Sequence, residues 1–82
     1  MVKVLCSVYD SKARVFSAPF CSPHIDVAIR DFTRAVNDPA TDLYKFPADY
    51  TLVHIGQFDD LTASVEINHP IVTIGLGSNY KE

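Results

Sequence analysis

Alternating apolar and polar positions near the start of the chain predict a β-hairpin. Residues 2–9 and 14–20 are rich in β-branched and aromatic side chains, which favour strands. Between them, residues 10–13 read Asp-Ser-Lys-Ala, a composition typical of a turn. Pro19 has no backbone N–H to donate, so we expect the second strand to end at a sheet edge or a bulge.

A second hairpin is predicted in the other half of the chain. Residues 50–57 and 62–67 have the composition of strands, and residues 58–61 that of a turn. Residues 70–76 predict a further short strand or an extended arm.

Apolar residues between the two hairpins recur with the period of a helix. Ser22 suits the N-cap and Pro23 the first helical position, and Asn37-Asp38-Pro39 is a stop signal. The residues of the apolar face are Ile25, Ala28, Ile29, Phe32 and Val36. A short second helical turn is predicted over residues 40–46, with Asp38 as its cap and Pro39 first.

The order hairpin, helix, hairpin predicts an α+β fold, with one main helix on one face of an antiparallel sheet. The chain has 82 residues, which predicts a single domain over residues 1–82 with a marginal core that a partner would stabilise. The apolar start, Met1 to Cys6, is too short for a signal peptide, and no apolar run reaches the roughly 18–20 residues that span a bilayer. We therefore expect a chain that starts at or near Met1, works in a cytoplasm and has no membrane partner.

If the first hairpin closes on residues 10–13, its side chains divide into two faces. The expected cross-strand pairs are Tyr9 with Arg14, Val8 with Val15, Ser7 with Phe16, and Lys3 with Phe20. One face is then aliphatic and suits packing under the helix; it carries Val2, Val4, Cys6, Val8, Val15 and Cys21. The other face is aromatic and basic; it carries Lys3, Leu5, Tyr9, Arg14, Phe16 and Phe20.

Aromatic rings flanked by cations on an open sheet can stack the bases of single-stranded nucleic acid. The alternative is that Phe16 and Phe20 pack against the second hairpin or a second copy, because exposed apolar patches often mark protein interfaces. A slip of one residue in the pairing would exchange the two faces. Arg30 and Arg34, four apart on the polar side of the helix, could extend a phosphate-binding strip, or form a solvated face in which Asp26 supports Arg30.

No cluster of residues predicts catalysis, a metal or a cofactor. Cys6 and Cys21 favour two small buried residues rather than a disulfide or a zinc site. The histidines, His24, His54 and His69, lie in three separate elements. Asp59-Asp60 favours a turn, and nothing in the sequence lowers the pKa of Cys6 to make it a nucleophile. We therefore predict a non-catalytic protein.

Several stretches, taken in order, are similar to the small nonstructural protein of gokushoviruses, in the Microviridae, whose genomes are circular single-stranded DNA. The matching stretches are residues 8–12, Pro19-Phe20, residues 28–39, residues 47–52 and residues 55–60. The resemblance implies a viral nonstructural protein of the host cytoplasm that binds DNA or serves single-stranded DNA synthesis. It implies no catalytic residue.

Two functions follow as hypotheses. The first is binding of single-stranded DNA during genome synthesis or handover to packaging, through Lys3, Tyr9, Lys12, Arg14, Phe16, Phe20, Arg30 and Arg34. The formal net charge of −3 counts against a generic nucleic-acid binder. The second is a homo-oligomeric interaction module that engages a viral replication or capsid protein, or a host factor. Inhibition of a host enzyme by acidic mimicry is less favoured, because the carboxylates are scattered over several turns.

Overall fold

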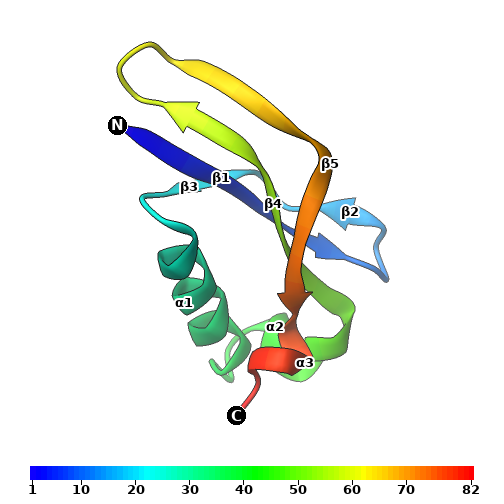
Figure 1. Cartoon of the computed structure of the whole chain (residues 1–82). Helices are drawn as coiled ribbons and strands as arrows, with labels where there is room; N and C mark the ends of the chain where they lie inside the picture. The colour runs from blue at the N-terminus through cyan, green and yellow to red at the C-terminus, as the bar shows by residue number, and fades with distance from the viewer.

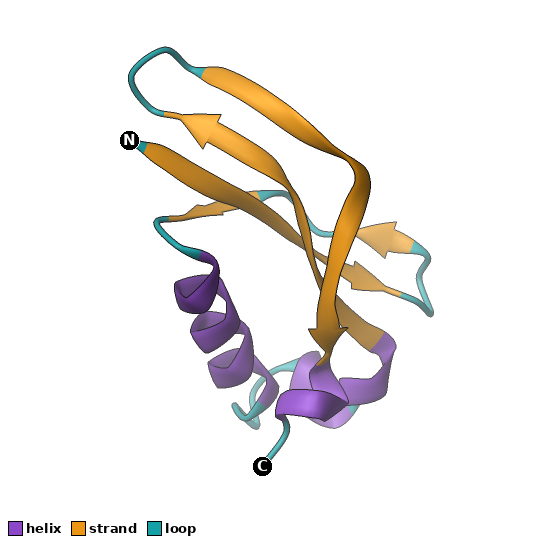
Figure 2. Cartoon of the chain, viewed as in Figure 1, coloured by secondary structure: helices purple, strands orange, loops and turns teal.

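The computed structural model describes all 82 residues, and its strands form one antiparallel sheet in the order β2-β1-β4-β5, with β3 also paired to β1 (Figure 1). The strands are β1 (Val2–Asp10), β2 (Val15–Phe16), β3 (Phe20–Ser22), β4 (Tyr50–Asp59) and β5 (Ser64–Leu76). The helices are α1 (Ile25–Val36), α2 (Asp42–Lys45), the 3₁₀ turn η1 (Pro47–Asp49) and α3 (Gly77–Tyr80). The helical segments gather together, away from the far end of the β4–β5 hairpin (Figure 2). The predicted α+β fold is confirmed.

The core lies between α1 and one face of the sheet. Cys6 of β1 and Leu52 of β4 meet Ala28, Phe32 and Val36 of α1, and all five side chains are buried. These helix positions belong to the apolar stripe that the sequence predicts, so burial of that stripe holds the helix to the sheet. Burial raises the pKa of the Cys6 thiol, and the nearby Cys21 raises it further. Cys6 is therefore a protonated core residue at neutral pH.

Helix α1 begins two residues later than its N-terminal signals predict. Ser22 is not the cap: it is the last residue of β3, it pairs with Val4, and it is buried. Because the backbone of Ser22 is held in the sheet, the chain turns over Pro23 before the helix starts at Ile25. The N-cap is His24, whose Nδ1 accepts a hydrogen bond from the backbone N–H of Asp26 at 3.2 Å. Asp26 forms no ion pair with Arg30, so the support of Arg30 by Asp26 that the sequence suggests is not found.

The cap of the second helix also differs from the prediction. Thr41, not Asp38, caps α2, and its hydroxyl accepts from the backbone N–H of Tyr44 at 3.1 Å. The Asp38 carboxylate instead accepts from the N–H of Ala40 at 3.0 Å, which makes a turn directly after α1. The predicted short helix therefore exists but starts later.

The predicted pairing of the first hairpin is wrong. Tyr9 pairs with Phe16 rather than with Arg14, a shift of two residues that leaves Phe16 on its predicted face. After Phe16 the chain leaves the ladder over residues 17–19 and returns with Phe20 opposite Cys6. This further shift of one residue turns Phe20 toward the core and leaves Cys21 exposed, the reverse of both predictions. The predicted break at Pro19 is confirmed, and it causes the exchange.

Both hairpins close with the same four-residue turn. In the first, Asp10 and Val15 pair around residues 11–14; in the second, Asp59 and Ser64 pair around residues 60–63. The carboxylate of each aspartate accepts a backbone N–H two residues on, at 3.0 Å for Asp10 and 2.9 Å for Asp59. The last loop residue has a positive φ in both, 59° at Arg14 and 62° at Ala63. The aspartates thus act as turn residues, as the sequence indicates for residues 58–61.

Strands β4 and β5 form the longest hairpin, and their pairing is interrupted in the middle. Gly56 pairs with Ile67 and His54 with Val72, so that residues 68–71 bulge opposite Ile55. The Asn68 side chain donates to the backbone oxygen of His54 across this bulge at 3.2 Å, and the His69–Pro70 peptide bond is cis. The predicted fourth strand and the predicted segment 70–76 are therefore two parts of one bent strand.

The last residues return to the helix. The backbone oxygen of Tyr80 accepts from the Asn37 side chain at 3.1 Å, and the Asn37 side-chain oxygen accepts from the N–H of Glu82 at 2.8 Å. The Tyr80 ring meets Phe32 edge-on, with ring centroids 5.9 Å apart. The chain end thus ties β5 to the C-terminal end of α1.

Candidate nucleic-acid interface

One face of the sheet has no helix on it. Val4, Cys6 and Val8 of β1 point toward α1, so alternation directs Lys3, Leu5, Ser7 and Tyr9 to the other side. Their partners on β4 continue the same surface: Phe58 opposite Lys3, and Val53 opposite Ser7. We call this surface, from Lys3 and Phe58 to Tyr9 and Phe16, the open face.

An aromatic pair lies at one end of the open face. The rings of Tyr9 and Phe16 are 4.6 Å apart between centroids and tilted by 45°. Phe16 keeps 48% of its surface exposed although it is held against Tyr9. Such a pair offers a ring of fixed orientation on which a flat aromatic group can stack.

Beside Phe16 the open face is hollowed. The hollow has a volume of about 330 Å³. Its lining residues come from four parts of the chain and are Ser7, Phe16, Ser17, Pro19, Ile55 and Ile71. The buried Ser7 hydroxyl donates to the backbone oxygen of Ser17 at 2.8 Å, so the polar group of the floor is already satisfied. The hollow therefore suits an apolar or aromatic group.

Charge differs between the two faces. The strand carboxylates Asp10, Asp59 and Glu66 occupy register positions on the helix side: Asp10 has the parity of Cys6, Asp59 pairs with Val2, and Glu66 pairs with Gln57. Asp10 faces Tyr50 there, and burial together with this carboxylate raises the pKa of Tyr50. The middle of the open face thus holds no carboxylate, although the whole chain is acidic.

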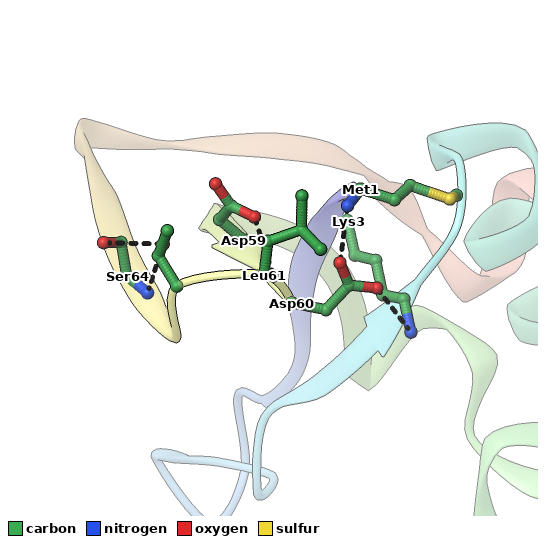
Figure 3. A network of polar contacts seen from close by, with 7 residues as sticks. Met1, Lys3, Asp59, Asp60, Leu61 and Ser64 are labelled. Carbon is green, nitrogen blue, oxygen red and sulfur yellow. Dashed lines mark hydrogen bonds and ion pairs between the residues drawn. The ribbon is translucent and has the colours of Figure 1, made fainter.

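The predicted cations of the first hairpin differ in whether a carboxylate lies close to them. Lys12 and Arg14 lie in the exposed loop beside the aromatic pair, and neither forms an ion pair. Lys3, at the other end of the open face, lies 3.7 Å from Asp60. Figure 3 shows the Asp60 carboxylate between the N-terminal amine of Met1 and the Lys3 ammonium. The hydrogen bond from that amine, with the two positive charges, holds the pKa of Asp60 below its usual value.

Three of the predicted site residues lie elsewhere. Phe20 packs against the core and is not available on the open face. Arg30 and Arg34 are exposed on α1, which covers the opposite face of the sheet. They border a polar hollow of about 640 Å³ together with Thr33, Asn37, Asp38 and Glu82. The structure therefore brings together Tyr9, Lys12, Arg14 and Phe16, with Lys3 on the same face, and separates the other three.

Two residues that line the hollow, Ile55 and Ile71, are not predicted from the sequence. Ile55 reaches the hollow because it is the unpaired residue at the bulge in β4, and Ile71 because β5 bends there. One signal for the hollow is present in the sequence: Pro19 has no backbone N–H, which predicts that strand pairing is interrupted near Ser17. Long-range pairing with two other strands decides the rest.

The structure holds no group of three or more His, Cys, Asp or Glu side chains that could hold a metal ion. No helix is long and apolar enough to cross a membrane. The fold and the candidate site thus define a small α+β protein whose sheet has one carboxylate-poor face without a helix on it.

The sequence pattern of the family described as "Phage ORF5 protein" matches residues 3–80. The chain belongs to this bacteriophage protein family. Comparisons with curated proteins and with solved structures gave no match.

Proposed function

We propose that this phage protein binds single-stranded DNA through the open face and has no catalytic activity. The observation that carries the proposal is the exposed Phe16 ring, fixed against Tyr9 beside an apolar hollow, with Lys12 and Arg14 in the loop of the same hairpin. One base stacks on Phe16 at the hollow, and the loop cations meet the neighbouring phosphates. A duplex hides the faces of its bases, so single strands bind more tightly.

The acidic net charge limits this mode of binding. Lys12 and Arg14 supply two phosphate contacts, and Lys3 supplies a third if the phosphate displaces Asp60. Two or three such contacts give a slope of log K against log salt of about −1.4 to −2.1 for a single strand. The proposal is therefore a modest, salt-sensitive binder in which stacking contributes as much as charge.

The direct test is fluorescence anisotropy of a labelled single-stranded oligonucleotide, titrated with the protein at several salt concentrations. In the double variant Arg14→Ala, Phe16→Ala, loss of stacking alone weakens binding by about 5- to 150-fold, since stacking contributes about 1–3 kcal/mol per base. The salt slope also becomes shallower by about 0.7 because one phosphate contact is lost. Alanine keeps the Cβ at position 14, so the backbone strain of the turn is unchanged.

The chain offers a matched control. Lys45 and Phe46 are also an exposed cation and an exposed phenylalanine, at the end of α2, and Phe46 is 57% exposed. The variant Lys45→Ala, Phe46→Ala changes charge and apolar surface by the same amount and should bind like the natural chain. Equal losses in both variants, or no binding at low salt, would remove the proposal.

We place this activity in the host cytoplasm, during synthesis of the phage genome or its handover to packaging. Membership of a phage family supports a viral setting. The finer assignment, to gokushoviruses of the Microviridae with single-stranded DNA genomes, is supported by the sequence stretches that resemble their small nonstructural protein.

A second candidate function is a protein-interaction module that engages a viral replication or capsid protein, or a host factor. It is favoured by the balance of apolar surface: six hydrophobic residues are buried, whereas twelve large ones are exposed. Absence of DNA binding, together with recovery of one phage protein by pull-down that Phe16→Ala abolishes, would favour this function over the first.

A further inference from the structure

The loop of the second hairpin brings a carboxylate to the cation at the far end of the open face. Asp60 follows β4 directly, and its carboxylate lies between the N-terminal amine of Met1 and the Lys3 ammonium (Figure 3). The Lys3 ammonium is 3.7 Å from Asp60 Oδ2. The backbone N–H of Asp60 also donates to the backbone oxygen of Met1, at 3.2 Å. The loop is therefore anchored to the start of β1 by its backbone as well as by this carboxylate.

The turn itself does not need a carboxylate at position 60. The same turn in the first hairpin has Ser11 at the corresponding place. The carboxylates that accept loop N–H groups are those of Asp10 and Asp59. The Asp60 carboxylate accepts only from the Met1 amine, and the second charge beside it is Lys3. It is thus held by cations, as a phosphate oxygen would be.

We propose that Lys3, with the neighbouring N-terminal amine, forms a second phosphate subsite on the open face, which Asp60 occupies until a phosphate of the bound single strand displaces it. This inference rests on the proposed function, because the phosphate belongs to the DNA strand that Phe16 holds. Asp60 therefore acts as a built-in competitor of the ligand at one end of the open face.

A single strand can reach both ends of the open face. Lys3 and Tyr9 are six residues apart on β1, which is about 20 Å at roughly 3.3 Å per residue. A stacked strand has one phosphate about every 3.4 Å, so about six nucleotides cover this length. An aromatic ring accompanies the cation at each end: Phe16 lies near Arg14, and Phe58 pairs with Lys3. A ring beside the cation favours a nucleotide over a free inorganic anion, because a base gains a surface to contact.

The competition operates at neutral pH. The hydrogen bond from the Met1 amine, with the positive charges of that amine and of Lys3, lowers the pKa of Asp60. The carboxylate is therefore ionised well below neutral pH, and a phosphate must displace it to reach Lys3. Removing its charge should make the Lys3 ammonium available to the strand.

Asp60→Asn tests the subsite by fluorescence anisotropy of a labelled single-stranded oligonucleotide of about twelve nucleotides. We expect the dissociation constant at about 50 mM salt to fall by about 5- to 10-fold, since one phosphate contact with a slope of 0.7 changes affinity about eightfold between that concentration and 1 M. The salt slope should become steeper by about 0.7. The backbone bond to Met1 keeps the loop in place in this variant.

Asp59→Asn is the matched control. It removes the same charge from the same hairpin, and Asp59 forms no ion pair. The asparagine side-chain oxygen can still accept the N–H of Leu61, as the carboxylate does at 2.9 Å. Its affinity for the oligonucleotide should stay within about twofold of that of the natural chain, because position 59 lies on the helix side of the sheet.

A third substitution identifies the cation. Lys3→Gln should weaken binding much more in the Asp60→Asn background than in the natural chain, where Asp60 already holds the ammonium. We expect the two substitutions to be coupled by at least about fivefold in the dissociation constant. Additive effects would overturn the assignment of the subsite to Lys3.

The outcomes separate this inference from the proposed function. Equal affinities of Asp60→Asn and Asp59→Asn, in a chain whose binding still depends on Phe16, would overturn the subsite and leave the proposed function standing. If no variant binds the oligonucleotide at low salt, the proposed function fails and the subsite for a DNA phosphate fails with it. Inorganic phosphate that shifts the amide resonance of Lys3 in Asp60→Asn as strongly as the oligonucleotide does would indicate a site for the free anion instead.

Discussion

At the scale of single residues, both hairpin turns place a residue other than glycine in a left-handed backbone conformation. Both turns need a left-handed residue at their last position, and neither has the glycine that adopts it most easily. At Arg14 the strained position places a free cation beside the aromatic pair. At Ala63 the side chain carries no charge that could contribute to binding. Under the proposed function, the same turn contributes to DNA binding in one hairpin and only connects strands in the other.

Replacing Ala63 with glycine should stabilise the fold. The φ of 62° costs alanine more than glycine, and the relief exceeds the added freedom of the unfolded chain. We expect a gain of about 0.5–1 kcal/mol in the free energy of unfolding, measured by urea denaturation with an unchanged slope. The control is Ala13→Gly in the other turn, where φ is not positive and the same change should destabilise. A loss of stability in Ala63→Gly would contradict this explanation.

At the scale of the elements, the sequence predicts which segments form strands and helices, and its errors come from pairing. The apolar period of α1 marks its buried face correctly because periodicity is a local property. The faces of Phe20 and Cys21 are reversed because the chain skips residues 17–19, and the number of residues skipped depends on how β1 is paired. The aromatic pair of the candidate site, Tyr9 and Phe16, stays on its predicted face because a shift of two residues preserves the face. The hollow depends on bulges in β4 and β5, which no local pattern predicts.

Gly56 sets how closely β4 and β5 approach each other. A Cβ at this position would lie 2.1 Å from the backbone oxygen of Glu66, so Gly56→Ala must push β5 away from β4. We expect a loss of about 1–3 kcal/mol in the free energy of unfolding, measured with urea. At Gly75 a Cβ would instead meet the Tyr80 side chain at 3.0 Å, which can move. Gly75→Ala should cost less, and the reverse order would show that the close backbone contact does not limit stability.

At the scale of the whole molecule, a small core on one side of the sheet is closed by the chain end. Tyr80 of α3 contacts two other elements. Its ring packs against Phe32 of α1 and lies next to Gly75 of β5, and its backbone oxygen accepts a hydrogen bond from Asn37 at the end of α1. The last turn of the chain thus stabilises the helix–sheet contact that the five-residue core begins.

Removal of the Tyr80 ring should lower the stability of the whole fold. We expect Tyr80→Ala to lower the free energy of unfolding by about 1–3 kcal/mol, because a half-buried aromatic ring is lost from the core. Tyr44→Ala is the control: this ring is 37% exposed and contacts the Lys81 ammonium at 4.2 Å, a contact that contributes about 0.5–1 kcal/mol. Thermal unfolding followed by circular dichroism compares the two. Equal losses would mean that the chain end does not support the core.

The alternation of side chains along β1 has an evolutionary consequence. Val4, Cys6 and Val8 hold the fold, whereas their immediate neighbours Lys3, Leu5 and Tyr9 make few of the contacts that hold α1 to the sheet. Selection for folding therefore acts most strongly on Val4, Cys6 and Val8 and on the buried Ser7, whereas Lys3, Leu5 and Tyr9 are freer to change with the phage's host and genome. A lineage of such proteins can change its proposed binding surface while its architecture stays constant, even though both depend on the same nine residues of β1.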